Sequence, residues 1–465
     1  MLFSSIPFLY YFLPLVLAVY FLVPRGLKNA VLFASSLLFY AWGEPRFCLF
    51  MLLSILQGYV FGRLIEKNAE NRKWSKIFLT ASVLLSLGLL GYCKYADFFI
   101  SSVNAVTGSS LKLLHVALPI GISFYTFQIL SYVVDVYRGD VPAQKSFLKL
   151  GTYIAMFPQL IAGPIVRYAE IAPQLDARET TLEDVSAGAG RFVIGLSKKV
   201  LLANVLYELI TVFQKSRDLS VLFYWLYAVS FTLQLYFDFS GYTDLALGLA
   251  LLFGFTLPEN FNHPYMANSV TDFWRRWHMS LSSWFRDYVY IPLGGSRCSK
   301  GRLVWNLFAV WGLTGLWHGA NWTFVCWGLW FFVLLSLEKL VWGQALAKLP
   351  GILRHVYAML AVFIGWIFFR SSSLSYAFSF LRALFVPGMG APDALSWLAL
   401  CIRQYGVQLA LCLLLSTNLG TSVWAALGKT KAGRAGRLLF LLVVLGLSVL
   451  SMAGSGMQAF IYAQF

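Results

Sequence analysis

The chain has 465 residues, of which 59% are hydrophobic, 17% aromatic and only 12% charged. Soluble domains carry about 25% charged residues, so this composition excludes a disordered chain, a disulfide scaffold and a typical soluble enzyme. A transmembrane helix needs about 20 apolar residues, and about eleven such spans would use roughly half of this length. The composition therefore predicts a single membrane domain that covers residues 1–465.

The formal net charge is +16, from 36 basic and 20 acidic residues. In a soluble protein such an excess would indicate a nucleic-acid partner. Here the basic residues lie in short gaps between apolar runs, which is the positive-inside pattern of multi-pass membrane proteins. We therefore expect membrane lipid as a partner and no nucleic acid.

Apolar runs follow one another along most of the chain. They cover 3–23, 29–43, 47–62, 77–92, 117–134, 199–213, 220–238, 303–317, 322–341, 356–369, 397–416 and 438–453. The first run lacks a basic region before it and is long enough to span, so we interpret it as a helix rather than a cleavable signal. None of the runs suits a β-barrel, which predicts an all-α polytopic protein with about 11–12 transmembrane helices plus re-entrant and interfacial helices.

Residues 150–174 do not have the pattern of a plain span. Pro158, Gly163 and Pro164 interrupt a short apolar stretch. Proline removes a backbone donor and glycine loosens a helix. Broken backbone at membrane depth occurs only where protein or a water-filled cavity covers it. We interpret the segment as a re-entrant loop, with a surface loop between two ordinary spans as the alternative.

Residues 237–302 are too polar to span a membrane and too aromatic for a solvated loop. Such a composition is typical of helices that lie in the membrane interface. Thr271 is expected to cap a helix, with Asp272 in its first turn and Arg276 as the i,i+4 partner of Asp272. We expect the stretch 271–302 to lie near the cytoplasmic face, where its basic residues would attract an anionic donor. Contact with lipid phosphate is the alternative.

Several familiar motifs are missing. No serine lies in a G-x-S-x-G pattern, and there is no H-E-x-x-H. Gly428-Lys429-Thr430 resembles the end of a P-loop, but Val423 stands where that motif requires glycine. The six cysteines form no C-x-x-C pair and most lie in apolar segments, so we expect buried hydrophobic side chains and no metal site.

His318 is the first candidate for chemistry. It lies between two long apolar runs, where ionisable residues are costly and usually functional. Gly312, Gly315 and Gly319 would let another backbone or a substrate approach closely. Asn321, three residues on, could orient the imidazole if the helix continues. The alternative is a packing histidine bonded to a neighbouring carbonyl.

His278 is the second candidate. On a helix, Trp274 and Ser282 would flank it at i,i+4 spacing. Arg275 lies three residues before it, and an arginine and a hydroxyl beside a histidine could bind a phosphate-bearing donor. The alternative is an interfacial histidine among tryptophans that anchor in the headgroup region.

Six ordered motifs carry a resemblance to a known family. They are Phe157-Pro-Gln-Leu-Ile-Ala-Gly-Pro-Ile-Val-Arg-Tyr168, Asp238-Phe-Ser-Gly-Tyr-Thr-Asp244, Pro258-Glu-Asn-Phe-Asn262, Phe273-Trp-Arg-Arg-Trp-His278, Trp284-Phe-Arg-Asp-Tyr288 and Gly315-Leu-Trp-His-Gly-Ala-Asn-Trp322. Together they resemble the membrane-bound O-acyltransferases, in the bacterial branch that contains the alginate O-acetylation and teichoic acid D-alanylation proteins. The likeness is closer to the alginate type, and the motif-bearing core covers about residues 115–370.

The resemblance implies a ring-like helical domain with a central tunnel in the inner (cytoplasmic) membrane. It matches His318 to the family's catalytic histidine and His278 to the second histidine of this branch. It implies a cytoplasmic acyl thioester donor, acetyl-CoA or an acyl carrier, as a substrate with no bound cofactor, and a separate extracytoplasmic acyltransferase as the partner protein. Substrate-binding or orienting roles are expected for Asn321, Trp274, Arg275, Trp317, Ser282 and Asp287.

The leading hypothesis is therefore an enzyme that passes a short acyl group, with acetyl favoured, towards a cell-surface or secreted polysaccharide. D-alanyl transfer from a carrier protein to teichoic acid and direct acylation of a lipid are the enzymatic alternatives. A transporter would be expected to show pseudo-symmetric halves with matching broken helices, whereas 150–174 and 237–302 differ in length and composition. A scaffold that only anchors a secreted transferase would not need His318.

Overall fold

The computed structural model describes residues 2–216, 220–386 and 394–454, and within these residues every regular element is a helix. The predicted all-α class is therefore confirmed. The chain divides into two compact units, which are described separately. Within the described residues, the first runs from the N-terminus to Phe192 and includes Thr243–Pro258, and the second comprises Val193–Tyr242 and the chain from Glu259 to residue 454. The expectation of a single domain stays a prediction.

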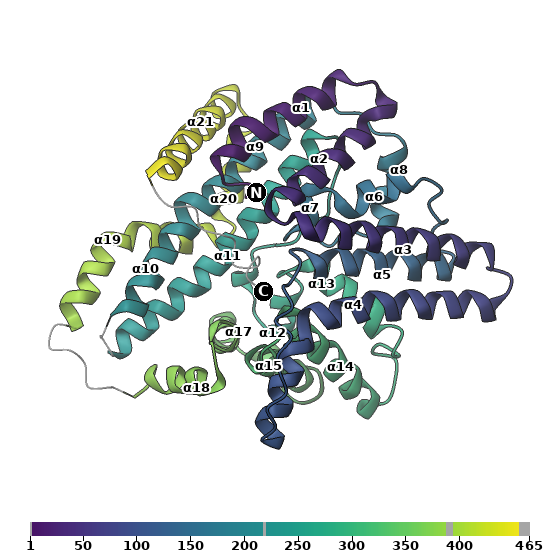
Figure 1. Cartoon of the computed structure of the whole chain (residues 1–465). Helices are drawn as coiled ribbons and strands as arrows, with labels where there is room; N and C mark the ends of the chain where they lie inside the picture. Colours follow the sequence, from purple (N-terminus) through teal and green to yellow (C-terminus); the bar gives the residue numbers. More distant parts are fainter. Residues whose placement is uncertain (1, 217–219, 387–393, 455–465) are drawn as a thin grey trace. The chain divides into compact units, whose positions relative to one another are not determined.

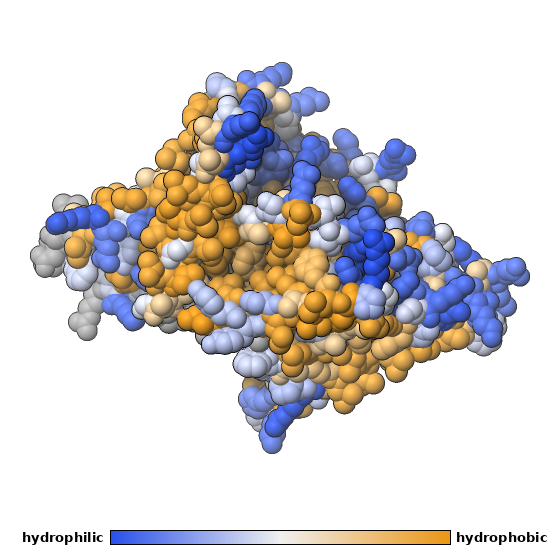
Figure 2. Space-filling model, turned by 90° about the horizontal axis from the view of Figure 1, so that it is seen from above, coloured by the Kyte–Doolittle hydropathy of each residue, from blue (hydrophilic) through white to orange (hydrophobic). Residues whose placement is uncertain are grey.

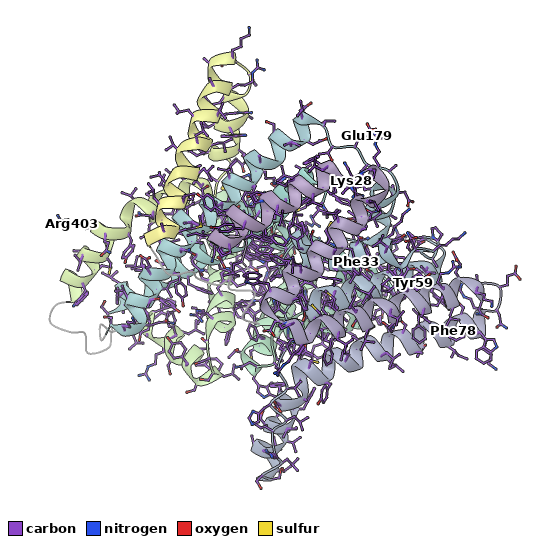
Figure 3. All side chains as sticks on the ribbon, turned by 45° about the horizontal axis from the view of Figure 1, so that its top comes forward. Lys28, Phe33, Tyr59, Phe78, Glu179 and Arg403 are labelled. Atoms are coloured by element: carbon purple, nitrogen blue, oxygen red, sulfur yellow. The ribbon has the colours of Figure 1, made fainter. Side chains whose placement is uncertain are left out.

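The first unit contains a bundle in which α3, α4 and α5 lie side by side (Figure 1). Phe147, at the start of α6, packs against Phe33 of α2 and Tyr59 of α3, with ring centroids 6.3 and 5.8 Å away, and Figure 3 labels both partners. In chain order the helices are η1 (Phe8–Phe12), α1 (Leu13–Leu22), η2 (Arg25–Leu27), α2 (Lys28–Gly43), η3 (Pro45–Phe47), α3 (Cys48–Lys67), α4 (Arg72–Thr107), α5 (Ile122–Arg138), α6 (Phe147–Ala155), α7 (Phe157–Leu160), α8 (Tyr168–Asp176) and α9 (Leu182–Ser197).

The segment 150–174 is a broken helix within this unit. Helix α6 ends at Ala155, α7 is a single turn, and residues 161–167 are not helical. The predicted interruption by proline and glycine is therefore confirmed. The Nζ of Lys149 lies 2.5 Å from Oδ1 of Asp176, so the two ends of the segment meet. This contact is the geometry that a re-entrant loop requires, while insertion into a membrane stays a prediction.

Side chains take up the backbone groups that the break leaves open. The Phe157 N–H donates to Ser36 Oγ at 3.0 Å. Gln159 Nε2 donates to the Tyr153 carbonyl at 2.6 Å, and the Tyr153 hydroxyl donates to the Val166 carbonyl at 2.9 Å. Because a buried unpaired polar group costs several kcal/mol in apolar surroundings, these bonds allow an irregular backbone to persist inside the bundle.

The second unit is built around the paired helices α14 and α15 and the neighbouring α17. Helices α9 and α11 contribute residues to both units. The elements are η4 (Lys198–Ala203), α10 (Asn204–Lys215), α11 (Val221–Leu252), η5 (Pro264–Met266), α12 (Val270–Trp274), α13 (Met279–Phe285), η6 (Arg286–Tyr290), α14 (Lys300–His318), α15 (Trp322–Leu337), η7 (Glu338–Trp342), α16 (Gly343–Lys348), α17 (Gly351–Arg370), α18 (Leu374–Ala383), α19 (Ala394–Leu415), α20 (Leu419–Leu427) and α21 (Lys431–Gly454).

The segment 237–302 differs from its prediction at two points. Its first residues continue the long helix α11 to Leu252, so the predicted interfacial segment begins too early. The predicted Thr271 cap is also wrong, because Ser269 Oγ accepts the Asp272 N–H of α12 at 2.9 Å. The predicted Asp272–Arg276 ion pair is confirmed at 2.8 Å.

Glu338 explains why the start of α12 was misplaced. Its carboxylate accepts hydrogen bonds from the Val270 N–H at 2.7 Å and from the Thr271 N–H at 2.9 Å. It also accepts the Thr271 hydroxyl at 2.5 Å. A buried carboxylate far along the chain therefore satisfies the first N–H groups of α12, and no local pattern reveals it.

Six helices among the described residues are long and apolar enough to cross a membrane. They cover Pro45–Lys67, Arg72–Thr107, Trp322–Lys348, Gly351–Arg370, Trp397–Leu415 and Lys431–Gly454. Fewer helices than the predicted 11–12 meet these criteria of length and composition among the described residues. Several apolar runs form shorter helices, such as α2 with 16 residues and α5 with 17. Broad hydrophobic areas on the surface in Figure 2 fit a multi-pass membrane protein.

The meeting of Lys149 and Asp176 predicts that both flanks of 150–174 face the same side of the membrane. In a background without the native cysteines, Lys145→Cys and Ala177→Cys should react with a membrane-impermeant maleimide from the same side. Both positions are exposed, so the reagent can reach them from the aqueous phase.

Positions 46 and 67 provide the matched control, because they lie at opposite ends of the candidate span Pro45–Lys67 and both are exposed. Arg46→Cys and Lys67→Cys should therefore react from opposite sides. If Lys145→Cys and Ala177→Cys also reacted from opposite sides, the segment would cross the membrane and the re-entrant interpretation would be wrong.

Candidate active site

His318 is the last residue of α14 and lies in an aromatic enclosure in the second unit. Only 4% of its surface is exposed. The imidazole centroid lies 4.8 Å from Trp317, 4.8 Å from Trp327 and 5.2 Å from Phe369. The rings of Trp327 and Phe369 stand nearly perpendicular to it, at 81° and 76°. This arrangement places an acid–base group in an apolar setting from which water is largely excluded.

The turn after His318 differs from the predicted continuing helix. The helix ends at His318, and Gly319 is extended with φ −172° and ψ 156°. Asn321 instead caps α15, where its Oδ1 accepts the Thr323 N–H at 3.0 Å. Its Nδ2 donates to the Ser372 carbonyl at 3.1 Å. The helix that was expected to bring Asn321 to the imidazole therefore ends before it. The Asn321 side chain instead bonds to the backbone of the turn and of Ser372.

Close backbone contact between α14 and α15 fixes the position of His318. A Cβ added at Gly315 would lie 2.6 Å from the Phe324 carbonyl oxygen, and one at Gly328 would lie 2.3 Å from the Trp311 carbonyl oxygen. A Cβ added at Gly312 would meet no atom within 4 Å. The predicted close approach is therefore confirmed at Gly315 and wrong at Gly312.

His278 lies between α12 and α13 rather than within a helix. Its backbone is left-handed, with φ 46° and ψ 54°, and it is the N-cap of α13. The predicted i,i+4 series with Trp274 and Ser282 is therefore wrong, because α12 ends at Trp274. The Ser282 hydroxyl donates to the Trp274 carbonyl at 3.3 Å and so ties the two short helices together.

The His278 side chain is almost completely buried, with 1% of its surface exposed. Its Nδ1 lies 3.1 Å from Oδ1 of Asn260. The Phe239 ring stands at 88° to it with the centroids 4.8 Å apart, and Trp317 lies 6.0 Å away. Burial lowers the pKa of His278 to about 3, so the imidazole is neutral at physiological pH.

Trp317 brings the two predicted histidines into one site. Its indole contacts His318 on the same helix and His278 from the turn before α13. The sequence separates these histidines by an interfacial segment and an apolar run. Trp317, one of the residues expected to orient the substrate, contacts both histidines, and the catalytic roles of His318 and His278 stay predictions.

The other predicted site residues have different places. Trp274 is buried and packs on Trp311 and Trp327 at 4.7 and 5.6 Å, so it supports the ring that contacts His318. Arg275 is exposed, and its side chain forms no hydrogen bond or ion pair with the described residues. Asp287 pairs with Arg286 at 2.6 Å.

Two supporting features escaped the sequence analysis. Asn260 lies in the quoted motif Pro258-Glu-Asn-Phe-Asn262, but no helical spacing connects it with His278. Lys199 and Asp238 form a buried ion pair at 2.5 Å, and Asp238 precedes the Phe239 that contacts His278. A charged residue inside an apolar run is the signal that could have revealed the pair, because such residues are expensive unless they serve a purpose.

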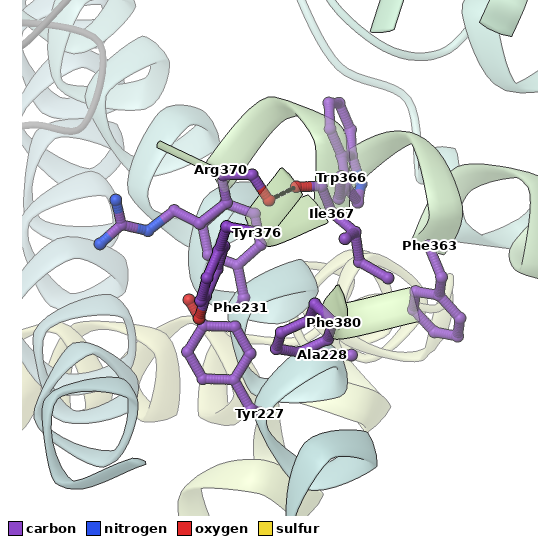
Figure 4. A pocket seen from close by; sticks show the side chains of 10 residues that line it. Tyr227, Ala228, Phe231, Phe363, Trp366, Ile367, Arg370, Tyr376 and Phe380 are labelled. Atoms are coloured by element: carbon purple, nitrogen blue, oxygen red, sulfur yellow. Dashed lines mark hydrogen bonds between the residues drawn. The ribbon is translucent and has the colours of Figure 1, made fainter. Parts of the chain in front are cut away.

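A small pocket lies beside the aromatic enclosure and is shown in Figure 4. Trp366 belongs to both, because it lines the pocket and packs on Trp327 and Phe369. The cavity has a volume of about 10 Å³, which admits about one water molecule. In Figure 4 the guanidinium of Arg370 points away from the pocket. This cavity is therefore too small for an acyl donor in the described conformation.

A family and several known proteins match the chain. The family described as MBOAT, membrane-bound O-acyltransferase, matches residues 142–380. A probable alginate O-acetylase of Azotobacter vinelandii is 43% identical over 390 residues, which cover 83% of this chain and 78% of the relative. A peptidoglycan O-acetyltransferase of Helicobacter pylori is 34% identical over 421 residues, with 83% and 80% covered. A teichoic acid D-alanyltransferase of Bacillus subtilis is 32% identical over 251 residues, with 50% and 62% covered.

The contact between α14 and α15 predicts different effects for two glycines on one helix. Gly315→Ala should lower the thermal midpoint of the purified protein, because its Cβ would collide with the Phe324 backbone and overpacking typically costs about 1–3 kcal/mol. Gly312→Ala should leave the midpoint unchanged or raise it, because its Cβ enters open space. Equal midpoints for the two variants would contradict the described packing.

Proposed function

The chain belongs to the membrane-bound O-acyltransferase family, and from this premise we propose that it transfers acetyl from a cytoplasmic thioester donor across the inner membrane. The acceptor system is a cell-surface or secreted polysaccharide. Relatives named alginate O-acetylase and peptidoglycan O-acetyltransferase support O-acetylation. The observation that carries the proposal is His318 inside its aromatic enclosure, with His278 on the same indole.

His318 takes the role of general base in the proposed reaction. An acceptor hydroxyl attacks the thioester carbonyl carbon while the imidazole takes the hydroxyl proton. A C–O bond forms, the C–S bond breaks, and the departing thiolate takes the proton back from the imidazolium. A neutral imidazole suits this exchange near neutral pH, and positioned acid–base groups contribute about 10²–10⁴-fold in rate.

The apolar walls of the site serve the same reaction. Water would compete with the acceptor hydroxyl for the acyl group, and a closed apolar site prevents that side reaction. Trp317, Trp327 and Phe369 surround the imidazole of His318 with hydrophobic surface. The enclosure therefore favours transfer over hydrolysis, which a protein that only anchors a partner would not need.

The basic residues of 271–302 are proposed to attract the donor at the cytoplasmic face. Arg275, Arg297 and Lys300 are exposed, and acetyl-CoA and acyl carriers are both anionic. A positively charged surface raises the local concentration of such a substrate. On the other side of the membrane, a separate extracytoplasmic acyltransferase would receive the acyl group and deliver it to the polysaccharide.

D-alanyl transfer is the second candidate function. It is favoured by the likeness to a teichoic acid D-alanyltransferase, which covers 50% of this chain at 32% identity. The likeness to alginate O-acetylases extends over 83% of the chain at 43% identity. Acetyl is therefore the preferred acyl group, and an assay with acetyl and D-alanyl donors would separate the two functions.

His318→Ala should abolish polysaccharide acetylation in cells that carry the variant at matched membrane expression. The loss should reach about 10²–10⁴-fold, because a positioned acid–base group is removed. His278→Ala should impair acetylation less completely, because His278 positions the substrate in this proposal. His115→Ala is the matched control with no expected effect, because His115 is exposed.

Acetylation at the wild-type level by correctly inserted His318→Ala would contradict the catalytic role and favour a scaffold. Recruitment of the extracytoplasmic partner can be measured in the same cells. We expect His318→Ala to recruit this partner as the wild type does, because the imidazole is not needed for anchoring. Loss of acetylation together with retained membrane insertion would support catalysis.

Charge reversal tests the proposed donor surface. The double variant Arg297→Glu and Lys300→Glu should raise KM for the anionic donor roughly 10-fold and leave kcat unchanged, because electrostatic attraction acts before chemistry. Its KM should also respond less to salt. The reversal of the exposed Lys429 and Lys431 is the matched control. An unchanged KM in the first variant would assign these residues to lipid phosphate instead.

A further inference from the structure

Asn260 is completely buried and is the centre of a small hydrogen-bond cluster in the second unit. Its Oδ1 accepts the Ser280 N–H at 3.1 Å and the Ser280 hydroxyl at 2.9 Å. The same oxygen lies 3.1 Å from Nδ1 of His278. The Asn260 carbonyl accepts the Met279 N–H at 3.0 Å. One residue therefore holds three consecutive positions of the turn that carries His278.

The orientation of the Asn260 amide follows from its partners. The Ser280 backbone N–H can only donate, so the amide atom that faces it must be the oxygen. Nδ1 of His278 faces the same oxygen and must therefore carry a hydrogen to form its bond. A neutral imidazole has a single N–H group, so Nε2 of His278 keeps its lone pair.

The protonation state of His278 supports the same assignment. A second proton on the ring would place a cation in a site that is 1% exposed, and burial lowers the pKa of His278 to about 3. The ring therefore stays neutral, with hydrogen on Nδ1 only. Hydrogen bonding of one ring nitrogen is the usual way in which proteins choose the tautomer of the other.

The turn is also strained, which explains why it needs a clamp. His278 has φ 46°, a region that residues with a Cβ seldom adopt. Such a conformation costs about 1–3 kcal/mol and persists where the surroundings hold it. Asn260 Nδ2 is buried and makes no hydrogen bond with the described residues.

We propose that Asn260 is a positioning residue that fixes His278 as the Nδ1–H tautomer, so that Nε2 of His278 can only accept a hydrogen bond from a substrate hydroxyl. The role of His278 toward a substrate hydroxyl rests on the proposed function, whereas the assignment of its tautomer does not. It gives the two histidines separate tasks: His318 exchanges the proton, and His278 orients the hydroxyl as a permanent acceptor.

Three titratable residues are next in the chain to the residues that contact His278. Glu259 precedes Asn260 in the chain, and His318 follows Trp317. Asp238 precedes Phe239 on α11 and is paired with Lys199. Asn260 is the polar side chain in contact with Nδ1 of His278. A charged residue in its place would therefore put that charge next to the ring.

Asn260→Asp provides the sharpest test, because a carboxylate keeps the oxygen that Ser280 and His278 bond to. Its negative charge raises the pKa of His278 and stabilises the imidazolium. Acetylation should therefore fall at acidic pH, where Nε2 gains a proton, and recover as pH rises. Asn260→Ala should lose roughly 10- to 100-fold at every pH, the range seen when the partner that orients a histidine is removed. Protonation of the base His318 gives the wild type an acidic limb of its own, so the decisive result is that Asn260→Asp extends the loss of acetylation to higher pH than in the wild type.

Asn262→Ala is the matched control, because Asn262 is exposed in the same loop and makes its hydrogen bonds with the described residues through its backbone. Its pH profile should match that of the wild type. If Asn260→Asp gave the wild-type profile, or if it lost activity equally at every pH like Asn260→Ala, Asn260 would have only a structural role and the proposal would be overturned.

Nitrogen-15 NMR of the full chain with labelled histidine tests the tautomer without any acyl transfer. The signal lost in His278→Ala identifies His278, and it should show Nδ1–H in the wild type and a tautomer mixture in Asn260→Ala. The Nε2–H form in the wild type would refute the proposal. If the Nδ1–H form were found while His278→Ala acetylated normally, the proposed role of His278 in catalysis would fail and the tautomer assignment would stand.

Discussion

The irregular segments depend on one constraint: backbone N–H and carbonyl groups that are buried among apolar side chains need hydrogen-bond partners within the chain. Water cannot satisfy them there, and each unpaired group costs several kcal/mol. Glu338 meets the constraint by accepting the first N–H groups of α12. Gln159 meets it at the broken helix by donating to the Tyr153 carbonyl. Side-chain hydrogen bonds therefore hold these irregular segments in place, which makes them suitable places for chemistry.

The same constraint separates the environments of the two histidines. His318 is surrounded by the rings of Trp317, Trp327 and Phe369. His278 is tied to Asn260, a neutral group that specifies one tautomer. Two groups of the same type can therefore perform different tasks, since the environment of each determines how it handles a proton.

The sequence was sufficient for features that depend on local pattern. Apolar runs predicted the all-α class, Pro158 and Gly163 predicted the broken helix, and the i,i+4 spacing predicted the Asp272–Arg276 pair. The remaining features depend on contacts between distant positions. The cap of α12 comes partly from Glu338, and the turn at His278 is held by Asn260. A periodic pattern contains no information about such partners, so a continuous helix through His278 was the natural but mistaken expectation.

The break before α13 changes what His278 can do. On a continuous helix its side chain would lie in line with Trp274 and Ser282. In the left-handed turn, the side chain instead meets Asn260 on one side and Trp317 on another. Trp317 also contacts His318, so the strained turn brings His278 to an indole that both histidines share. The left-handed backbone conformation costs about 1–3 kcal/mol. In return, His278 makes contacts that a regular helix would not allow.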